Sequence, residues 1–248
     1  MNALILAGGR GRRLGALTAN CSKATLKFAG KSLLAHVILS TSILEKKVKM
    51  IYIATGYQSE AVKQAIEREI EALDIDTPIV VLPPEINLAG TFKSTVEGLK
   101  AAGITENCLV TGIDALVTNT TMSEFIAASA KKKKTVFMIS PLLGIAPTHG
   151  FIRPNNTGQI MEYRKSSQGF GVSHSGYKWY SDVGIRYFDS SFINTCLSLP
   201  LTYPCDFDDV MPNLIKMGEK TQTHVISERW LHFGVSKDFN QKPLIQTK

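Results

Sequence analysis

The most constraining feature of this 248-residue chain is an apolar run that passes directly into a glycine-rich turn. Residues Leu4–Ala7 are followed by glycines at positions 8, 9 and 11. A short apolar run bounded by glycines predicts a buried strand. Glycine lets the chain pass close to a ligand and point its N–H groups at it, because no Cβ blocks the approach. The pattern therefore predicts a strand that ends in a backbone cradle, where polyphosphates bind in α/β sheets.

Basic side chains accompany this turn. Arg12 and Arg13 follow the last glycine directly, and Lys23 stands ten residues beyond Arg13. Two known phosphate motifs do not fit, because Leu14 replaces the third glycine of the dinucleotide fingerprint and Gly30–Ser32 lacks the earlier glycine of a P-loop. The structural alternative is a surface turn with solvated arginines. We interpret the ordered glycines, arginines and lysine as a phosphate site.

Short apolar runs alternate with helical patterns along the chain. This alternation predicts βαβ units and a mainly parallel sheet in an α/β domain. We expect helices near 33–43, 59–73 and 90–102. We expect strands near 2–6, 50–54, 78–82, 107–111, 135–140, 150–153, 160–163, 183–187 and 223–226. The interpretation is one domain over residues 1–248, with a nucleotide-binding half at about 1–140 and an acceptor-binding half at about 141–248.

Composition agrees with a compact cytoplasmic protein. A hydrophobic content of 44% allows one substantial core. No apolar run is long enough to span a bilayer, and nothing in the N-terminal residues argues for export. The cysteines show no C-x-x-C spacing, which predicts reduced, unpaired thiols rather than a disulfide framework or a zinc site. They are Cys21, Cys108, Cys196 and Cys205.

The net charge of +7 raises the question of nucleic-acid binding. Several cations fall in the predicted phosphate site, and Lys131–Lys134 cluster at one helix end, where the helix dipole favours them. No aromatic-studded strand or basic helix accompanies them. We therefore expect neither a nucleic acid nor a membrane as partner.

Asp114 is the strongest candidate for a metal ligand. It follows the predicted strand 107–111, so it is expected at the carboxyl edge of the sheet beside the glycine turn. Mg²⁺ takes oxygen ligands and usually one or two carboxylates together with phosphate oxygens of the substrate. The alternative is an aspartate that caps the following helix.

The pattern L-A-G-G-x-G-x-R-L-x-x-L-T, followed by a lysine and L-x-F-x-G-K-x-L-L, resembles the signature of the nucleotidyltransferases that act on sugar 1-phosphates. It covers Leu6–Thr18, Lys23 and Leu26–Leu34. The resemblance implies a Rossmann-like three-layer α/β fold with a mainly parallel mixed sheet, of the nucleotide-diphospho-sugar transferase type. It also implies that Arg13 and Lys23 stabilise charge during attack at the α-phosphorus. Arg12 replaces a threonine or serine of the family.

The same resemblance assigns further residues to the nucleotide and the metal. Asn87–Thr91 is similar to a turn that contacts the base and begins a helix, although a threonine there is also an ordinary N-cap. Asp114 matches the family's metal aspartate, with Ile113 inserted after Gly112. The residues that the resemblance implies for the nucleotide are Leu6, Ala7, Gly8, Gly9, Gly11, Arg12, Gly90, Thr91 and Gly112.

The acceptor half resembles the family more loosely. Residues 158–165 look like the strand pair that ends in a glutamate-lysine step, with Arg164 in the place of the glutamate. The resemblance implies acceptor roles for Glu162 and Lys165, although an exposed lysine at a strand end is often only solvated. Asp182 matches a polar residue before a glycine that contacts sugar hydroxyls in the family.

The largest departure from the family lies near the end of the chain. Arg229–Phe239 resembles the segment W-x-D-x-G-T-x-x-D-L, with His232 in the place of its metal aspartate. Imidazole is a poor ligand for Mg²⁺ but a good one for Mn²⁺, Co²⁺ or Zn²⁺. The site then uses a softer metal, relies on Asp114 alone, or is weakened. Otherwise His232 is a packing residue beside Trp230. Asp238 is expected to be the N-cap of the last short helix.

These features together predict a metal-dependent nucleotidyltransferase that joins a nucleoside triphosphate to a sugar 1-phosphate and releases pyrophosphate. The expected cofactor is Mg²⁺, with Mn²⁺ as an alternative. The glycine loop does not identify the base, and resemblance to the compact guanylyl- and thymidylyltransferases favours GTP. One alternative is a cytidylyltransferase for a non-sugar phosphate. Another is a non-catalytic nucleotide-binding regulatory homologue, which the change at His232 favours and the intact Arg13 and Lys23 oppose. Family resemblance also implies a homo-oligomer.

Overall fold

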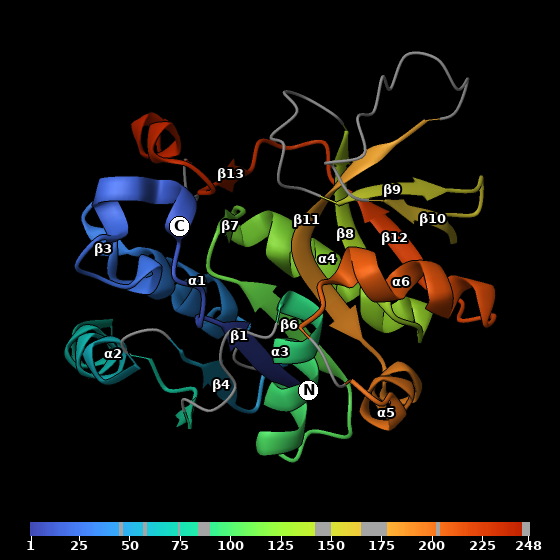
Figure 1. The fold of residues 1–248 in the computed structure, drawn as a ribbon, viewed down its shortest axis with the longest axis horizontal. Coiled ribbons are helices and arrows are strands. Elements are labelled where there is room, and N and C mark those ends of the chain that lie inside the picture. The colour runs from blue at the N-terminus through green and yellow to red at the C-terminus, as the bar shows by residue number, and fades with distance from the viewer. Residues whose placement is uncertain are drawn as a thin grey trace.

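The computed structural model describes residues 1–44, 47–56, 59–73, 75–83, 90–141, 150–164, 178–201 and 204–244. The first half of the chain alternates strands and helices. They are β1 (Asn2–Leu6), α1 (Leu33–Ser42), β4 (Ile51–Ala54), α2 (Ser59–Leu73), β5 (Ile79–Leu82), α3 (Thr91–Ala101) and β6 (Cys108–Gly112). The strands are parallel and lie in the order β5-β4-β1-β6 (Figure 1). The βαβ pattern predicted from the sequence is therefore confirmed.

The second half extends this sheet with antiparallel strands. Its elements are α4 (Asn119–Lys132), β8 (Val136–Pro141), β9 (Phe151–Pro154), β10 (Ile160–Arg164), β11 (Tyr180–Phe188), α5 (Ser190–Ser198), α6 (Phe207–Lys216) and β12 (Gln222–Val225). Strand β11 pairs antiparallel with β6, β8 and β9, and β12 pairs parallel with β8. The described residues thus form one mixed sheet of nine strands, in which β11 joins the two halves.

Several very short elements flank the sheet. They are η1 (Arg12–Thr18), η2 (Lys23–Thr25), β2 (Lys27–Phe28), β3 (Lys31–Ser32), β7 (Ala115–Leu116), β13 (Leu231–His232) and η6 (Ser236–Asn240). The sequence did not predict the two-residue strands, because so short a stretch shows no hydrophobic period. Strand β11 also begins earlier than expected, at Tyr180 rather than near Val183.

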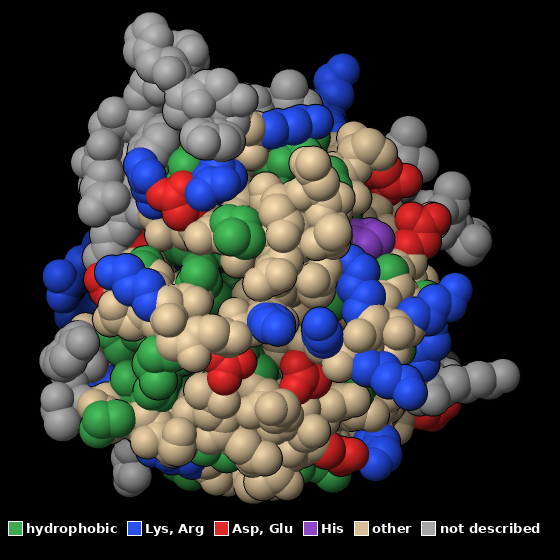
Figure 2. Space-filling model, turned by 90° about the vertical axis from the view of Figure 1, so that its right-hand side faces the viewer, with side chains coloured by type: hydrophobic (Ala, Val, Ile, Leu, Met, Phe, Trp, Pro, Cys, Tyr) green, Lys and Arg blue, Asp and Glu red, His purple; other side chains and the backbone are tan. Residues whose placement is uncertain are grey.

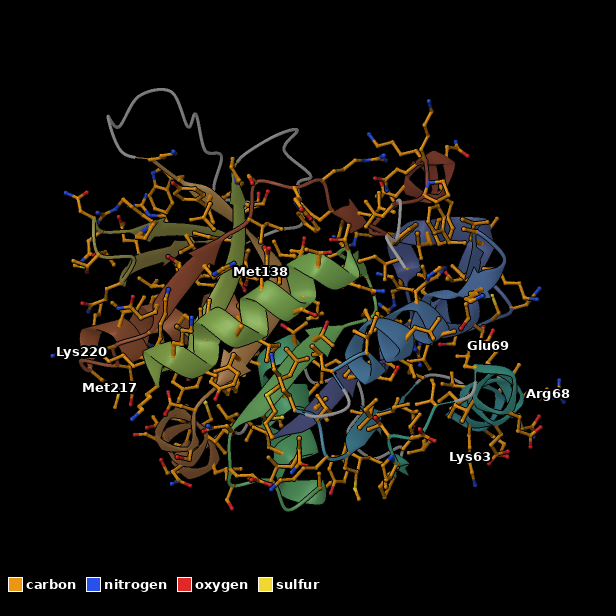
Figure 3. All side chains as sticks on the ribbon, turned by 180° about the vertical axis from the view of Figure 1, so that it is seen from behind. Lys63, Arg68, Glu69, Met138, Met217 and Lys220 are labelled. Atoms are coloured by element: carbon orange, nitrogen blue, oxygen red, sulfur yellow. The ribbon has the colours of Figure 1, made fainter. Side chains whose placement is uncertain are left out.

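Helices cover both faces of the sheet. Side chains along a strand alternate between its faces, so Ala3 and Ile5 of β1 pack on the side of α1, α2 and α4. Leu4 points the other way and packs on the side of α3, α5 and α6. Figure 3 looks onto the layer formed by α1, α2 and α4, with Met138 of β8 behind α4. The predicted three-layer α/β fold is confirmed.

A contact between α2 and the start of α1 fixes the chain just after the segment that carries Lys23. The Ser32 hydroxyl caps α1 by accepting a hydrogen bond from the Ala35 N–H at 3.0 Å. Glu69 of α2 accepts hydrogen bonds from the backbone N–H of Ser32, at 3.3 Å, and from its hydroxyl. In Figure 3, Glu69 lies on the side of α2 that faces α1, whereas Arg68 points outward.

The thiols agree with the sequence prediction. All four cysteines are free, and Cys108, Cys196 and Cys205 are buried. Burial raises the pKa of the Cys108 and Cys196 thiols above the ordinary value. No helix in the described part of the chain combines the length and apolar character that a bilayer crossing requires.

Gly90→Ala is expected to destabilise the fold by more than about 3 kcal/mol. Gly90 has φ +80°, and a Cβ there would lie 2.3 Å from the Cys205 carbonyl oxygen. The matched control is Gly103→Ala, because Gly103 also has positive φ (+63°) but open space around its Cβ position. Urea unfolding of both variants measures the difference. Equal losses of unfolding free energy would show that the contact with Cys205 can relax.

Candidate functional site

The candidate site lies where the direction of strand progression in the sheet reverses. From β1 the chain passes through α1 to β4 on one side, and from β5 it passes through α3 to β6 on the other side of β1. Helices α1 and α3 lie on opposite faces, so the carboxyl ends of β1 and β6 flank an opening between them. Ligands of open α/β sheets bind at such a switch point. The predicted glycine turn follows β1 there, and Asp114 follows β6.

The glycine turn folds back onto the segment that carries Lys23. Gly11 has φ +66°, and a Cβ there would lie 3.0 Å from a methyl carbon of Thr18 and 3.2 Å from Cβ of Lys23. The Gly11 carbonyl accepts hydrogen bonds from the Leu14 N–H at 2.8 Å and the Thr18 hydroxyl at 2.9 Å. Gly9 is exposed, and none of the described residues has an atom within 4 Å of its Cβ position. The turn is therefore open at the Cβ position of Gly9 and closely packed against Thr18 and Lys23 at the Cβ position of Gly11.

The cations around the turn differ in exposure. Arg12 and Arg13 are exposed, and neither side chain has an ion pair with another residue in the described ranges. Lys23 is 7% exposed and lies in η2, whose first turn is capped by the Ser22 hydroxyl. Its Nζ is 3.0 Å from Oδ2 of Asp114, which lies 91 residues away in the sequence. The structure thus brings together the predicted lysine and the predicted carboxylate.

Asp114 is not a helix cap. Helix α4 is capped by Thr118, whose hydroxyl accepts a hydrogen bond from the Thr121 N–H at 3.1 Å. The Asp114 side chain is 38% exposed. Its Oδ1 lies 2.8 Å from the position of a Cβ on Gly112, so the carboxylate needs the glycine beneath it. The capping alternative is therefore wrong, and an accessible carboxylate stands at the carboxyl edge of the sheet.

The pairing of β13 with β7 places His232 opposite the residue that follows Asp114. His232 stands opposite Ala115, and the Phe233 N–H donates to the Asp114 carbonyl at 2.9 Å. The His232 ring lies over Gly234, where a Cβ would be 2.4 Å from Cε1. Its Nδ1 is 3.9 Å from Oδ2 of Asp238. The metal role of His232 stays a prediction.

Asp238 does not have the role expected from the sequence. It lies inside η6, whose N-cap is Val235. Its Oδ2 accepts hydrogen bonds from the Gly234 N–H at 2.7 Å and the Val235 N–H at 2.8 Å. The Asp238 carboxylate therefore accepts the backbone N–H groups at the start of η6 from a position inside the helix. Asp238 lies three residues after the N-cap, instead of being the N-cap as predicted. This turn fixes the backbone immediately after His232.

The start of α3 forms hydrogen bonds with a residue from the second half of the chain. Gly90, not Thr91, is the N-cap of α3. The Thr91 N–H and hydroxyl both donate to Oδ1 of Asp206, at 2.6 and 2.9 Å. The sequence did not predict Asp206 because the contact spans 115 residues. The preceding residues Asn87–Ala89 lie outside the described residues.

Glu162 is held between two arginines in the second half of the chain. Arg153 Nε donates to Glu162 Oε2 at 2.6 Å, and Arg164 Nε donates to Oε1 at 2.9 Å. Partial burial alone would raise the pKa of Glu162, but the hydrogen bonds and charges of Arg164 and Arg153 outweigh it and hold the pKa below its ordinary value. Arg164 also lies 5.1 Å from the Trp179 ring centre. Lys165 lies outside the described residues.

Asp182 has partners inside the protein. Its side chain is 2% exposed, and its Oδ2 accepts from Arg186 and from the Tyr163 hydroxyl, each at 2.5 Å. Its Oδ1 accepts from the Gly184 N–H at 2.8 Å. Burial and the negative charge of Asp182 raise the pKa of Tyr163 well above its ordinary value. Both oxygens of the Asp182 carboxylate thus have partners within the protein, and the expected contact with sugar hydroxyls stays a prediction.

A separate hollow of about 520 Å³ opens among strands of the second half of the chain. It lies between the β9–β10 turn, β11 and β12, and Arg153, Lys178, Tyr180 and Thr223 are among its lining residues. The face that carries β9, β10 and the end of α6 is shown in Figure 2. Basic and acidic side chains are mixed over the described part of this face, and they form no continuous basic band there.

The sheet order and the site at its carboxyl edge are those of nucleotide-binding α/β proteins. Residues 2–243 match the nucleotidyl transferase family, and the chain belongs to that family. The resemblance found in the sequence is thereby confirmed. Glucose-1-phosphate adenylyltransferases of Yersinia pseudotuberculosis and Yersinia pestis are 46% identical to this chain over 66 residues. That stretch spans 27% of this chain and only 15% and 14% of the two relatives.

Two solved structures share the fold over nearly the whole chain. An inositol-1-phosphate CTP transferase from T. maritima has a TM-score of 0.74 at 17% identity, covering 96% of this chain and 90% of that one. A protein from Bacillus anthracis assigned as a glucose-1-phosphate thymidylyltransferase, in complex with sucrose, has a TM-score of 0.76 at 16% identity. That match covers 97% of this chain and 92% of the other.

Proposed function

We propose that this protein joins a nucleoside triphosphate to a sugar 1-phosphate, giving a nucleotide sugar and pyrophosphate. The observation that carries the proposal is the meeting of the glycine turn, Lys23 and Asp114 at the switch point, with Lys23 Nζ 3.0 Å from Asp114 Oδ2. A phosphate oxygen of the acceptor attacks the α-phosphorus, and the bond from that phosphorus to the bridging oxygen breaks. The electron pair leaves on pyrophosphate, so no covalent enzyme intermediate is needed.

Positive charge close to the triphosphate supports this reaction. The exposed guanidinium groups of Arg12 and Arg13 follow the glycine turn, and Lys23 lies beneath it. In our proposal Arg13 and Lys23 neutralise the charge that develops on the phosphates and the leaving group. Preorganised charges and positioning account for most of the catalysis of such transfers.

Asp114 is the proposed ligand of a divalent cation. Its accessible carboxylate supplies the oxygen donor that Mg²⁺ prefers. Imidazole suits Mn²⁺ better than Mg²⁺, so a role for His232 favours Mn²⁺. When bound, the cation would neutralise charge on phosphate oxygens.

The nucleotide and the acceptor are the finer part of the proposal. The names of the relatives are those of adenylyl-, CTP- and thymidylyltransferases, and GTP remains our first candidate. Glucose and inositol 1-phosphates, which those names mention, are both phosphates of a six-membered ring. The buried position of Asp182 favours an acceptor site that differs from the family pattern. This keeps a non-sugar phosphate, with CTP, as the second candidate.

The test is release of pyrophosphate from ATP, CTP, GTP, UTP and dTTP with a panel of sugar and polyol 1-phosphates, with Mg²⁺ and then with Mn²⁺. We expect release with one nucleotide and one class of acceptor. Tight nucleotide binding without release from any pair would contradict transferase activity and support a regulatory homologue.

A further inference from the structure

The first turn of α3 is capped by a segment from the acceptor half. The first N–H groups of a helix lack partners within the helix and need acceptors from elsewhere. Here Oδ1 of Asp206 accepts from Thr91 N–H at 2.6 Å, and the Cys205 carbonyl accepts from the N–H groups of Phe92 and Lys93 at 3.1 and 3.2 Å. A carboxylate at this end also interacts favourably with the helix dipole.

The contact between the start of α3 and Cys205 requires a residue without a side chain at position 90. Gly90 forms no side-chain cap of its own, and the Cys205 backbone occupies the space that a Cβ would need. The Thr91 hydroxyl adds a second hydrogen bond to the same oxygen of Asp206, at 2.9 Å. The conformation of the Gly90–Thr91 turn therefore depends on Cys205 and Asp206.

The segment that supplies the cap is itself firmly held. The Asp206 N–H donates to Oδ2 of Asp209 at 2.8 Å, which fixes the start of α6. The next ring, Phe207, packs edge-on against Phe92 at 5.1 Å between centroids. The Arg186 guanidinium also lies 3.7 Å from the centre of the Phe207 ring. The backbone that carries Asp206 is thus held in place by these contacts. A residue that positions a binding site needs such support.

We infer that Asp206 is a positioning residue for the nucleotide. The inference rests on the proposed function and on the base contact that the family resemblance implies for the Gly90–Thr91 turn, which begins α3 after β5. Asp206 sets the direction of α3 and the conformation of this turn, so a residue of the acceptor half completes the nucleotide half. Loss of its carboxylate should weaken nucleotide binding more than it slows the chemical step, because Asp206 lies at the turn and not at the Lys23–Asp114 pair.

The test compares Asp206→Ala with Asp206→Asn, which keeps an oxygen acceptor for Thr91. Titration calorimetry with each of ATP, CTP, GTP, UTP and dTTP, with Mn²⁺ and without acceptor, measures Kd directly. We expect Asp206→Ala to raise Kd and the nucleotide KM about tenfold, because the released turn would be in its binding conformation only about a tenth of the time, with kcat within about twofold. Asp206→Asn should recover most of the affinity.

Glu219→Ala is the matched control, because Glu219 lies beyond the far end of α6 and its carboxylate accepts from the Thr195 hydroxyl at 2.8 Å. It removes the same charge and should leave Kd unchanged. A lower Tm with an unchanged Kd in Asp206→Ala would overturn the inference and leave a purely structural cap. Wild-type binding without transfer would refute only the proposed catalysis, whereas no binding of any nucleotide by the wild type would overturn both.

Discussion

Lys23→Met is expected to lower kcat for nucleotidyl transfer by about a thousandfold, because it removes a preorganised positive charge from the triphosphate site. Lys23 is 7% exposed, and its Cβ lies close to Gly11 beneath the glycine turn. Methionine keeps an unbranched chain of similar length, so the packing under the turn is preserved. The measurement is the rate of pyrophosphate release at saturating substrates.

The matched control for this variant is Lys27→Met. Lys27 lies in the neighbouring strand β2 and is exposed, so this substitution removes the same charge a short distance along the chain. We expect the control to keep wild-type kcat and both variants to keep a similar Tm. A Lys23→Met enzyme with more than about a tenth of the wild-type kcat would remove this lysine from the proposed mechanism.

Asp114→Asn is expected to lower kcat by about 10²- to 10³-fold and to weaken Mn²⁺ binding. The amide is nearly the same size as the carboxylate, so its fit over Gly112 is retained while the ionic ligand is lost. Titration of Mn²⁺ followed by electron paramagnetic resonance gives the affinity without turnover.

Asp76→Asn is the control, because Asp76 is exposed just beyond α2. It should bind Mn²⁺ as the wild type does. His232→Asp, measured alongside, tests the second ligand and should shift the preference from Mn²⁺ toward Mg²⁺. Undiminished Mn²⁺ affinity in Asp114→Asn would place the cation elsewhere.

The sequence was informative wherever local pattern decides the structure. The apolar run before Gly8 predicted β1, and the period of Ser59–Leu73 predicted α2 over the same residues. Asp114 was expected at the carboxyl edge because it follows an apolar strand, and it lies there beside Lys23. Parallel strands bring their carboxyl ends to one edge, so residues far apart in sequence could be grouped correctly.

Pattern failed where a side chain takes its role from a distant partner. Nothing in the sequence around Asp182 indicates that the hydroxyl of Tyr163, 19 residues earlier, donates to its carboxylate. The contact of Asp206 with Thr91 leaves no local signal either, because the acceptor belongs to a different helix. An aspartate within a short helix looks like an N-cap from sequence alone, which explains the error at Asp238.

The antiparallel pairing of β11 with β6 limits how this molecule can move. Backbone hydrogen bonds run from Ile185 opposite Thr111 to Phe188 opposite Cys108, across the boundary between the two halves. Rotating one half away from the other as a hinged body would break this ladder and expose the buried strands of both halves. We therefore expect any closure around a substrate to come from segments at the carboxyl edge of the sheet. The paired strands should keep their positions relative to one another.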